Sequence, residues 1–133
     1  MAFWLFKEEP THYNFADLEK DGSTVWDGVN NNLARKHLRS VKAGDRILYY
    51  HTGKEKAVVG EMRAASDAES TAEGGVRVKV EPVKRLPAPV PLSVIKKDAD
   101  LADWELVRIS RLSVMPVSAK QWKRIEQLSK ESS

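Results

Sequence analysis

The chain has 133 residues, a length typical of one domain with a single hydrophobic core. Its 41% hydrophobic and 31% charged residues are ordinary for a folded protein, which argues against intrinsic disorder. It contains no cysteine, so disulfides, thiolate metal ligands and a cysteine nucleophile are excluded.

The formal net charge of +3 is unevenly placed along the chain. Residues 1–30 hold two Lys against six Asp or Glu, whereas residues 31–63 hold eight Lys or Arg against three acidic residues. This asymmetry is compatible with a polyanionic partner, although a solvated basic helix gives the same pattern.

The first apolar run, A-F-W-L-F, is short and has no basic residue before it. It predicts neither a signal peptide nor a membrane-spanning segment, and we expect a cytoplasmic or, in a eukaryote, a nuclear protein that does not contact membranes. The same run reads as a buried strand over residues 2–6. Residues 11–20 predict a short helix or turn that ends at Gly22.

Trp26 follows in a polar stretch, V-W-D-G-V-N-N-N, which predicts a loop. A helix is expected from Asn31 or Asn32, because an Asn is a favourable N-cap and Leu33, Ala34, His37, Leu38 and Val41 share one face. Gly44 is the expected end of this helix.

The centre of the chain predicts a hairpin. Strands are expected over residues 45–51 and 57–65, joined by the turn T-G-K-E-K. Gly60 inside the second strand indicates a bulge or a close approach of another group to the backbone. The polar residues 66–75 predict a surface loop.

The last part of the chain combines strands with short helices. Residues 76–83 alternate cleanly and predict a half-buried strand, and the proline-rich residues 86–92 predict an extended edge segment. A short helical segment near 92–104 and a strand in R-L-S-V-M-P follow. Ser118 and Gln121 form a capping box for a final helix.

Together these elements predict an α+β fold. The helices do not alternate with the strands as a doubly wound parallel sheet requires, so we expect a mostly antiparallel β-barrel of five or six strands decorated by short α-helices. Residues 2–129 form a single domain in this reading, and residues 130–133 are expected to fray.

The sequence favours binding over catalysis. His12, His37 and His51 have no metal-ligand spacing, and no nucleophile elbow or phosphate-binding loop is present. Glu8 and Glu9 are adjacent on an extended chain and point apart, which makes them a poor acid–base pair. We therefore expect no catalytic residues, no metal and no cofactor.

Four separated segments carry a family resemblance: W-L-F-K-E-E-P, V-W-D-G-V-N-N-N-L-A-R, L-Y-Y-H-T-G and S-R-L-S-V-M-P-V. In this order and spacing they resemble the EVE domain family, whose barrel belongs to the PUA-like group, from Phe3 to about Leu128. The chain departs from the family pattern at Glu8, where a small hydroxyl residue is usual, and at Asn30, where an Arg is usual.

The resemblance implies a pocket that accepts a flat ring, because EVE domains are similar to YTH domains and are proposed readers of modified bases. It favours DNA as the nucleic acid and Trp26 as the stacking platform. The implied ligand-binding residues are Lys7, Glu8, Trp26, Asp27, Gly28, Val29, Asn30, Asn31, Tyr50, His51, Thr52, Ser110, Arg111 and Leu112. Backbone phosphates are expected to contact Arg35, Lys36, Arg39 and Lys42.

The partners follow from the same reading. The chain carries no nuclease domain, so any cleavage of the nucleic acid would come from a separate effector protein, and we expect the domain itself to be a monomer. Three alternatives stay open. These are an RNA-binding PUA-like module, an enzyme acting on a nucleotide or another small molecule through His51, and an interaction scaffold that uses the P-A-P-V-P run.

Overall fold

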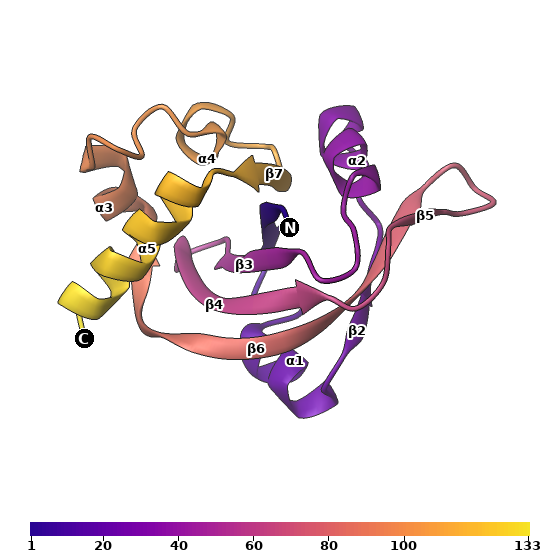
Figure 1. Cartoon of the computed structure of the whole chain (residues 1–133), viewed down its shortest axis with the longest axis horizontal. Helices are drawn as coiled ribbons and strands as arrows, with labels where there is room; N and C mark the ends of the chain where they lie inside the picture. Colours follow the sequence, from indigo (N-terminus) through magenta and orange to yellow (C-terminus); the bar gives the residue numbers. More distant parts are fainter.

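A curled mixed sheet organises the chain, as the computed structural model of all 133 residues shows (Figure 1). Its strands are β1 (Phe3–Glu8), β2 (Thr24–Trp26), β3 (Arg46–His51), β4 (Ala57–Ala64), β5 (Glu69–Ser70), β6 (Val76–Pro91) and β7 (Val114–Val117). The strand order is β2-β6-β4-β3-β1-β7, and β5 pairs only with β6. The helices are α1 (Phe15–Asp21), α2 (Asn32–Arg39), α3 (Leu92–Lys97), α4 (Glu105–Arg108) and α5 (Ala119–Glu131).

The sheet is antiparallel except where β1 runs parallel to β3. This confirms the predicted α+β architecture: the sheet forms a half-barrel with short helices around it (Figure 1). The expected number of five or six strands was too low. Seven are present, because residues 24–26 and 69–70 each add a short ladder to β6.

The parallel pairing of β1 with β3 brings four polar or aromatic residues of the predicted binding site side by side. Lys7 is paired with Tyr50, and Glu8 with His51. Because the two strands run in the same direction, their C-terminal ends lie at the same end of the half-barrel. Adjacent residues on each strand point to opposite faces of the sheet.

Strand β6 is longer than the sequence indicated. The expected edge segment 86–92 lies mostly within it, and Val90 and Pro91 pair with the start of β4. Register shifts between Val58 and Gly60 and between Glu61 and Met62 let one strand follow the curl of β4 along its whole length. The prolines are accommodated because such irregularities interrupt the hydrogen-bond ladder.

The predicted close approach of another group to the backbone at Gly60 is confirmed. A Cβ at this position would lie 2.6 Å from two carbons of the Phe15 ring, so only glycine lets α1 pack this close to β4. Phe15 is fully buried, and Asn14 begins α1 with a capping box. The segment 11–20, expected to be a helix or turn, is thus a turn followed by α1.

Helix α2 begins at Asn32 with Asn31 as its N-cap, as predicted, but ends at Arg39 rather than near Gly44. The reason lies in Asp45, which is only 4% exposed. Its carboxylate accepts hydrogen bonds from the Lys42 amide at 2.9 Å and from the Trp4 indole at 2.9 Å. These tertiary contacts turn the chain out of the helix before the glycine is reached.

The remaining tryptophans belong to the core. Trp104 is 1% exposed, and its indole nitrogen donates to the Pro116 carbonyl at 3.2 Å. Trp122 lies on α5, which the predicted capping box of Ser118 and Gln121 starts. This helix continues to Glu131, two residues into the segment expected to fray.

None of the helices is both long and apolar enough to span a membrane.

Candidate functional site

Trp26 is the last residue of strand β2, whereas the sequence predicted that it lies in a loop. It pairs with Val78 of β6, and its side chain is only 6% exposed. The indole packs against Phe6 at 5.4 Å between ring centroids and meets Tyr49 edge-on at the same distance. The β-branched residues Thr24 and Val25 favour this short strand, and the loop begins only at Asp27.

The exposed margin of Trp26 lines a cavity of about 160 Å³, here named the Trp26 pocket. Tyr13 adds a second ring, and its hydroxyl donates to the Asp21 carboxylate at 2.9 Å. Glu8 contributes a carboxylate that accepts from the Glu9 amide at 2.9 Å. Its side chain also lies 3.3 Å from the His12 ring. The lining residues are Glu8, His12, Tyr13, Thr24, Val25, Trp26 and Asp27.

The glycine–asparagine loop borders a second cavity of about 310 Å³, here named the loop pocket. Arg35 holds this loop in place, because its Nε donates to the Val29 carbonyl at 2.6 Å and a terminal nitrogen donates to the Asn30 side chain at 3.4 Å. The opposite wall comes from the β5–β6 hairpin. The lining residues are Asp27, Gly28, Val29, Asn30, Arg35, Thr71, Glu73, Gly75 and Val76.

Four predicted ligand-binding residues lie elsewhere, around a cavity of about 230 Å³ that we name the lysine pocket. It involves the ends of β1 and β3 together with α3 and α4. The lining residues are Lys7, Tyr50, Thr52, Gly53, Lys56, Leu92, Lys96, Leu106, Val107 and Ser110. Because Lys7 follows Phe6 and precedes Glu8 on β1, it lies on the face of the strand opposite the Trp26 pocket.

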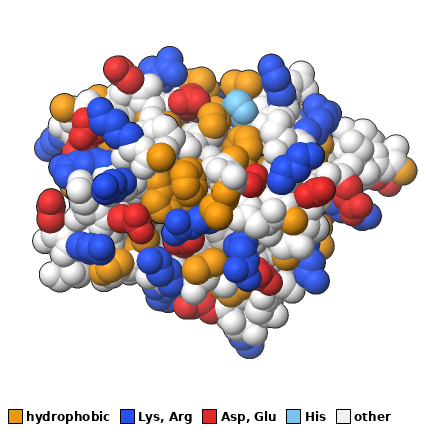
Figure 2. All heavy atoms as spheres, in the orientation of Figure 1, with side chains coloured by type: hydrophobic (Ala, Val, Ile, Leu, Met, Phe, Trp, Pro, Cys, Tyr) orange, Lys and Arg blue, Asp and Glu red, His pale blue; other side chains and the backbone are white.

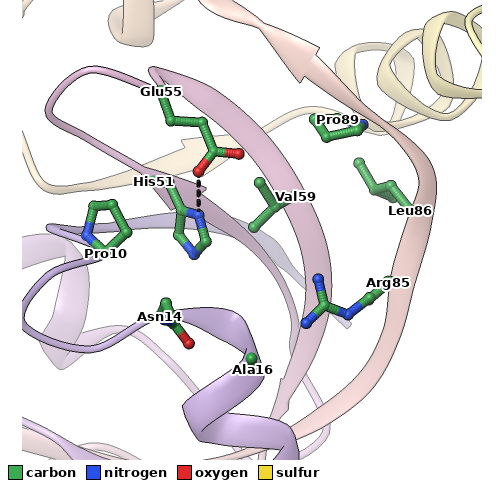
Figure 3. Close-up of a pocket in the computed structure, with 9 residues that line it drawn as sticks. All are labelled: Pro10, Asn14, Ala16, His51, Glu55, Val59, Arg85, Leu86 and Pro89. Atoms are coloured by element: carbon green, nitrogen blue, oxygen red, sulfur yellow. Dashed lines mark hydrogen bonds and ion pairs between the residues drawn. The ribbon is translucent and has the colours of Figure 1, made fainter.

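His51 lines none of these three cavities and is hydrogen-bonded within the fold. Its Nε2 accepts from the Phe15 amide at 3.1 Å, and its Nδ1 lies 2.7 Å from a carboxylate oxygen of Glu55. These partners favour the tautomer with the proton on Nδ1. The ring borders another cavity, of about 460 Å³, across which Arg85 lies (Figure 3).

Three predicted ligand-binding residues line none of the cavities described above. Leu112 is fully buried in the core, whereas Arg111 is exposed and lines none of the cavities described above. Asn31 acts as the N-cap of α2, where its side chain accepts from the Ala34 amide at 3.0 Å. The structure thus distributes the predicted site over several cavities.

The basic residues of α2 and its following turn are free to meet an anion. Lys36, Arg39 and Lys42 are exposed, and none lies within 4.0 Å of a carboxylate. Figure 2 shows Lys and Arg side chains over α2 and over the α3 end of the same face, with acidic groups between them.

Sequence reasoning missed several lining residues of the Trp26 and loop pockets. His12 and Tyr13 come from the segment T-H-Y-N, which predicted only a helix or turn. Thr71, Glu73 and Gly75 come from a segment that predicted only a surface loop. The aromatic character of H-Y beside K-E-E-P was the available signal for the first pair. No local signal places the hairpin beside the loop.

The sequence pattern of the EVE domain matches residues 2–128. The chain belongs to the EVE domain family. This EVE domain is similar to Rpa0253 from Rhodopseudomonas palustris, with 34% identity over 100% of this chain and 96% of that one, and a TM-score of 0.92. Thymocyte nuclear protein 1 of Danio rerio is 26% identical over 166 aligned positions, which cover 96% of this chain and 72% of the relative.

A third likeness concerns the fold of this EVE domain. The human THYN1 protein, solved in complex with DNA that contains 5-methylcytosine, has a TM-score of 0.89 and 24% identity, and each chain is covered over 98% of its length. In the human, chicken, mouse and rat thymocyte nuclear proteins, the matched segment is only 32–35% of the full length.

Proposed function

We propose that this EVE domain is a non-catalytic module that binds a modified base in nucleic acid, with DNA favoured over RNA. The observation that carries the proposal is the Trp26 pocket, where the rings of Trp26 and Tyr13 and the carboxylate of Glu8 surround one small cavity. The human THYN1 protein, whose fold is similar, was solved with methylated DNA, which supports this ligand class.

The chemistry of the pocket suits a base that carries an exocyclic amino group. Such a group donates hydrogen bonds, and a Glu carboxylate is the acceptor that commonly reads the amino group of cytosine. The apolar margins of Trp26, Tyr13 and Val25 offer a surface for a methyl group. We therefore choose 5-methylcytosine as the first candidate ligand.

Binding of a base drawn out of the duplex requires only a modest stacking energy from the Trp26 and Tyr13 rings. Drawing a base out of a duplex costs a few kcal/mol, and stacking on an aromatic side chain returns about 1–3 kcal/mol. Because most of Trp26 is packed in the core, we assign it the role of a fixed wall. Tyr13 is half-buried, which suits it to stack on the base.

Phosphate contacts are assigned to the exposed cations Lys36, Arg39 and Lys42 on and just after α2. They lack carboxylate partners, so binding phosphates would break no ion pair of the fold. Such contacts supply affinity and its salt dependence, whereas the pocket supplies selectivity. We assign no phosphate contact to Arg35, because its guanidinium group is hydrogen-bonded to the Val29 carbonyl in the glycine–asparagine loop.

The proposal of a non-catalytic role is supported by the contacts of His51. Both of its ring nitrogens have partners inside the fold, so neither is poised to take a proton from a substrate. The alternative of an enzyme acting through His51 predicts turnover on nucleotides or amides that is lost in His51→Ala. A panel of such substrates tests it directly.

Binding to matched oligonucleotides tests the main proposal. We would measure fluorescence anisotropy at low salt with DNA containing one 5-methylcytosine, with the same DNA carrying plain cytosine, and with the corresponding RNA. We expect a preference for the methylated DNA that Tyr13→Ala reduces at least about fivefold. The control Val83→Ala, an exposed position outside the cavities described here, should keep that preference.

Two results would redirect the interpretation. Equal binding of all three oligonucleotides, unaffected by Tyr13→Ala, would reject a base-reading function. Tighter binding of the RNA, still dependent on Tyr13, would favour the RNA-binding alternative.

A further inference from the structure

The lysine pocket has an unusual charge balance for a cavity in this protein. Three lysines, Lys7, Lys56 and Lys96, line it and no carboxylate does. None of the three lies within 4.0 Å of an acidic side chain, although eight ion pairs form elsewhere in the chain. The nearby carboxylate of Glu9 is occupied by the hydroxyls of Thr52 and Thr11, each at 3.3 Å.

Lys7 is the most constrained of the three. Its ammonium group donates to the Ser110 carbonyl at 3.0 Å, and no other protein group accepts from it. The same nitrogen lies 5.6 Å from the centre of the Tyr50 ring. Burial lowers the pKa of Lys7, because the charged form loses water without gaining a carboxylate.

Tyr50 provides a second donor in the pocket. Its side chain is 3% exposed, yet its hydroxyl has no hydrogen-bond partner in the protein and is not among the fully enclosed polar atoms. Tyr50 lines the lysine pocket, so we count its unpartnered hydroxyl among the donors available there. Burial raises the pKa of Tyr50 to about 12, so the hydroxyl keeps its proton and donates at neutral pH.

The backbone around the pocket is also constrained. Lys56 is the only residue other than glycine with a positive φ, at 46°. Its carbonyl accepts from the Leu92 amide at 2.8 Å, which ties the β3–β4 turn to the start of α3. Side chains held on unusual backbone at a cavity are a frequent feature of ligand sites.

We propose that the lysine pocket binds a phosphate group, with Lys7, Lys96 and the Tyr50 hydroxyl as donors. A cavity with several N–H and O–H donors and uncompensated positive charge is complementary to phosphate oxygens, and charge-assisted hydrogen bonds of this kind are strong. The apolar side chains of Leu92, Leu106 and Val107 form another part of the lining, suited to the sugar or base beside the phosphate.

The phosphate has two possible sources with the same chemistry. It belongs either to the backbone of a bound nucleic acid, a phosphodiester, or to a free nucleotide, a phosphomonoester. Only the first source rests on the proposed base-reading function. The pocket lies across β1 from the Trp26 pocket, so its occupation is measured independently of base preference.

Nuclear magnetic resonance titrations of the full chain test this inference. The probes are inorganic phosphate, deoxycytidine 5′-monophosphate and a dithymidine phosphodiester, each followed by backbone amide shifts. We expect the largest shifts at Lys7, Tyr50, Thr52 and Lys56. Lys96 is exposed, so we expect Lys96→Met to keep the fold and to weaken binding about fivefold or more.

The matched control is Lys123→Met, which removes another exposed lysine, from α5. Binding of the diester supports a nucleic-acid backbone as the source, and binding of the monophosphate alone supports a free nucleotide. The inference is overturned if no probe shifts these amides, or if Lys96→Met behaves like Lys123→Met. Methylated-DNA preference that survives such a result would leave the proposed function standing.

Discussion

Lys7 and Glu8 are neighbours on β1, yet their side chains line cavities on opposite faces of the sheet. The alternation of an extended strand separates the two charges, so that a cation borders the lysine pocket and a carboxylate borders the Trp26 pocket. The two residues therefore have separable effects on binding. The negative charge of Glu8 is the departure from the family pattern that matters most for the proposed base site.

Replacing Glu8 by Gln tests that charge. Glu8→Gln removes a negative charge that repels the phosphates of any bound DNA but keeps an acceptor oxygen for the base, so we expect tighter binding of plain and methylated DNA alike. The gain should be about twofold to fivefold at low salt and should vanish at high salt. Anisotropy titrations measure it, and Glu131→Gln at the end of α5 is the control. Equal affinities for Glu8→Gln and this control would contradict the charge argument.

Trp26 supports the core as well as the pocket. Because its indole packs on Phe6 and Tyr49, we expect Trp26→Ala to lower the free energy of unfolding by about 3–5 kcal/mol. Urea denaturation measures this change, and Trp26→Phe should lose clearly less. A loss below about 1 kcal/mol for Trp26→Ala would show that the ring contributes little to packing. The Ala variant is therefore a poor probe of ligand binding.

Gly60 should tolerate no side chain. Gly60→Ala would place a methyl group 2.6 Å from the Phe15 ring, so α1 must shift and we expect a loss of about 1–3 kcal/mol. Thermal unfolding checks this result. In Gly75→Ala the added group meets only the Thr71 hydroxyl, at 3.1 Å, and the loss should be smaller. Equal losses in the two variants would refute the close-approach argument.

Asp45 should stabilise the fold down to acid pH. Burial alone would raise its pKa, but hydrogen bonds from the Lys42 amide, the Trp4 indole and the Ala2 amide outweigh burial, and the pKa lies below its ordinary value of 3.8. A lowered carboxyl pKa contributes stability that is present above pH 3.8 and is lost as the pH falls further.

The variant Asp45→Asn replaces one acceptor oxygen by a donor, so it opposes the donors that converge on this side chain. We expect it to lower the free energy of unfolding by about 1–3 kcal/mol at neutral pH. The difference from the unmodified protein should shrink at acid pH. Denaturant unfolding at pH 7 and near pH 3 measures both quantities, and a difference independent of pH would contradict the assignment.

Tyr50 should contribute to alkaline unfolding. Its pKa in the folded protein, raised by burial to about 12, lies above the ordinary value of 10.0. The stability linked to its neutral form is therefore fully present below about pH 10 and is lost as the pH rises toward 12. Tyr50→Phe has no such proton, so its denaturation midpoint should fall less between pH 9 and pH 12. Parallel curves for the two proteins would exclude this linkage.

Local signals predicted much of the fold. The β3–β4 hairpin, the N-cap of α2 and the capping box of α5 each depend on residues a few positions apart, and all are present. The end of α2 was misplaced, because Asp45 reaches Lys42 and Trp4 through contacts that no helix signal contains. Strand β2 was missed because a three-residue strand forms only against its partner β6.

The sequence predicted which residues are candidates for ligand binding, but it did not predict which of them lie in the same pocket. Trp26, Glu8 and Asp27 do share a pocket, whereas Lys7, Tyr50 and Ser110 surround another. Spacing along the chain could not reveal this division, since it depends on which face of β1 and β3 each residue occupies once the strands pair. Tyr13 and the hairpin residues 71–75 join the pockets only because the sheet curls.

The sequence by itself determined the family, the α+β class and the set of polar and aromatic residues available for binding, because these depend on residue types in order along the chain. Only the tertiary structure decided which of those residues meet. The parallel register of β1 with β3 and the burial of Trp26 are long-range effects of strand pairing and hydrophobic packing. They place the lysines and the Trp26 ring on opposite sides of one sheet.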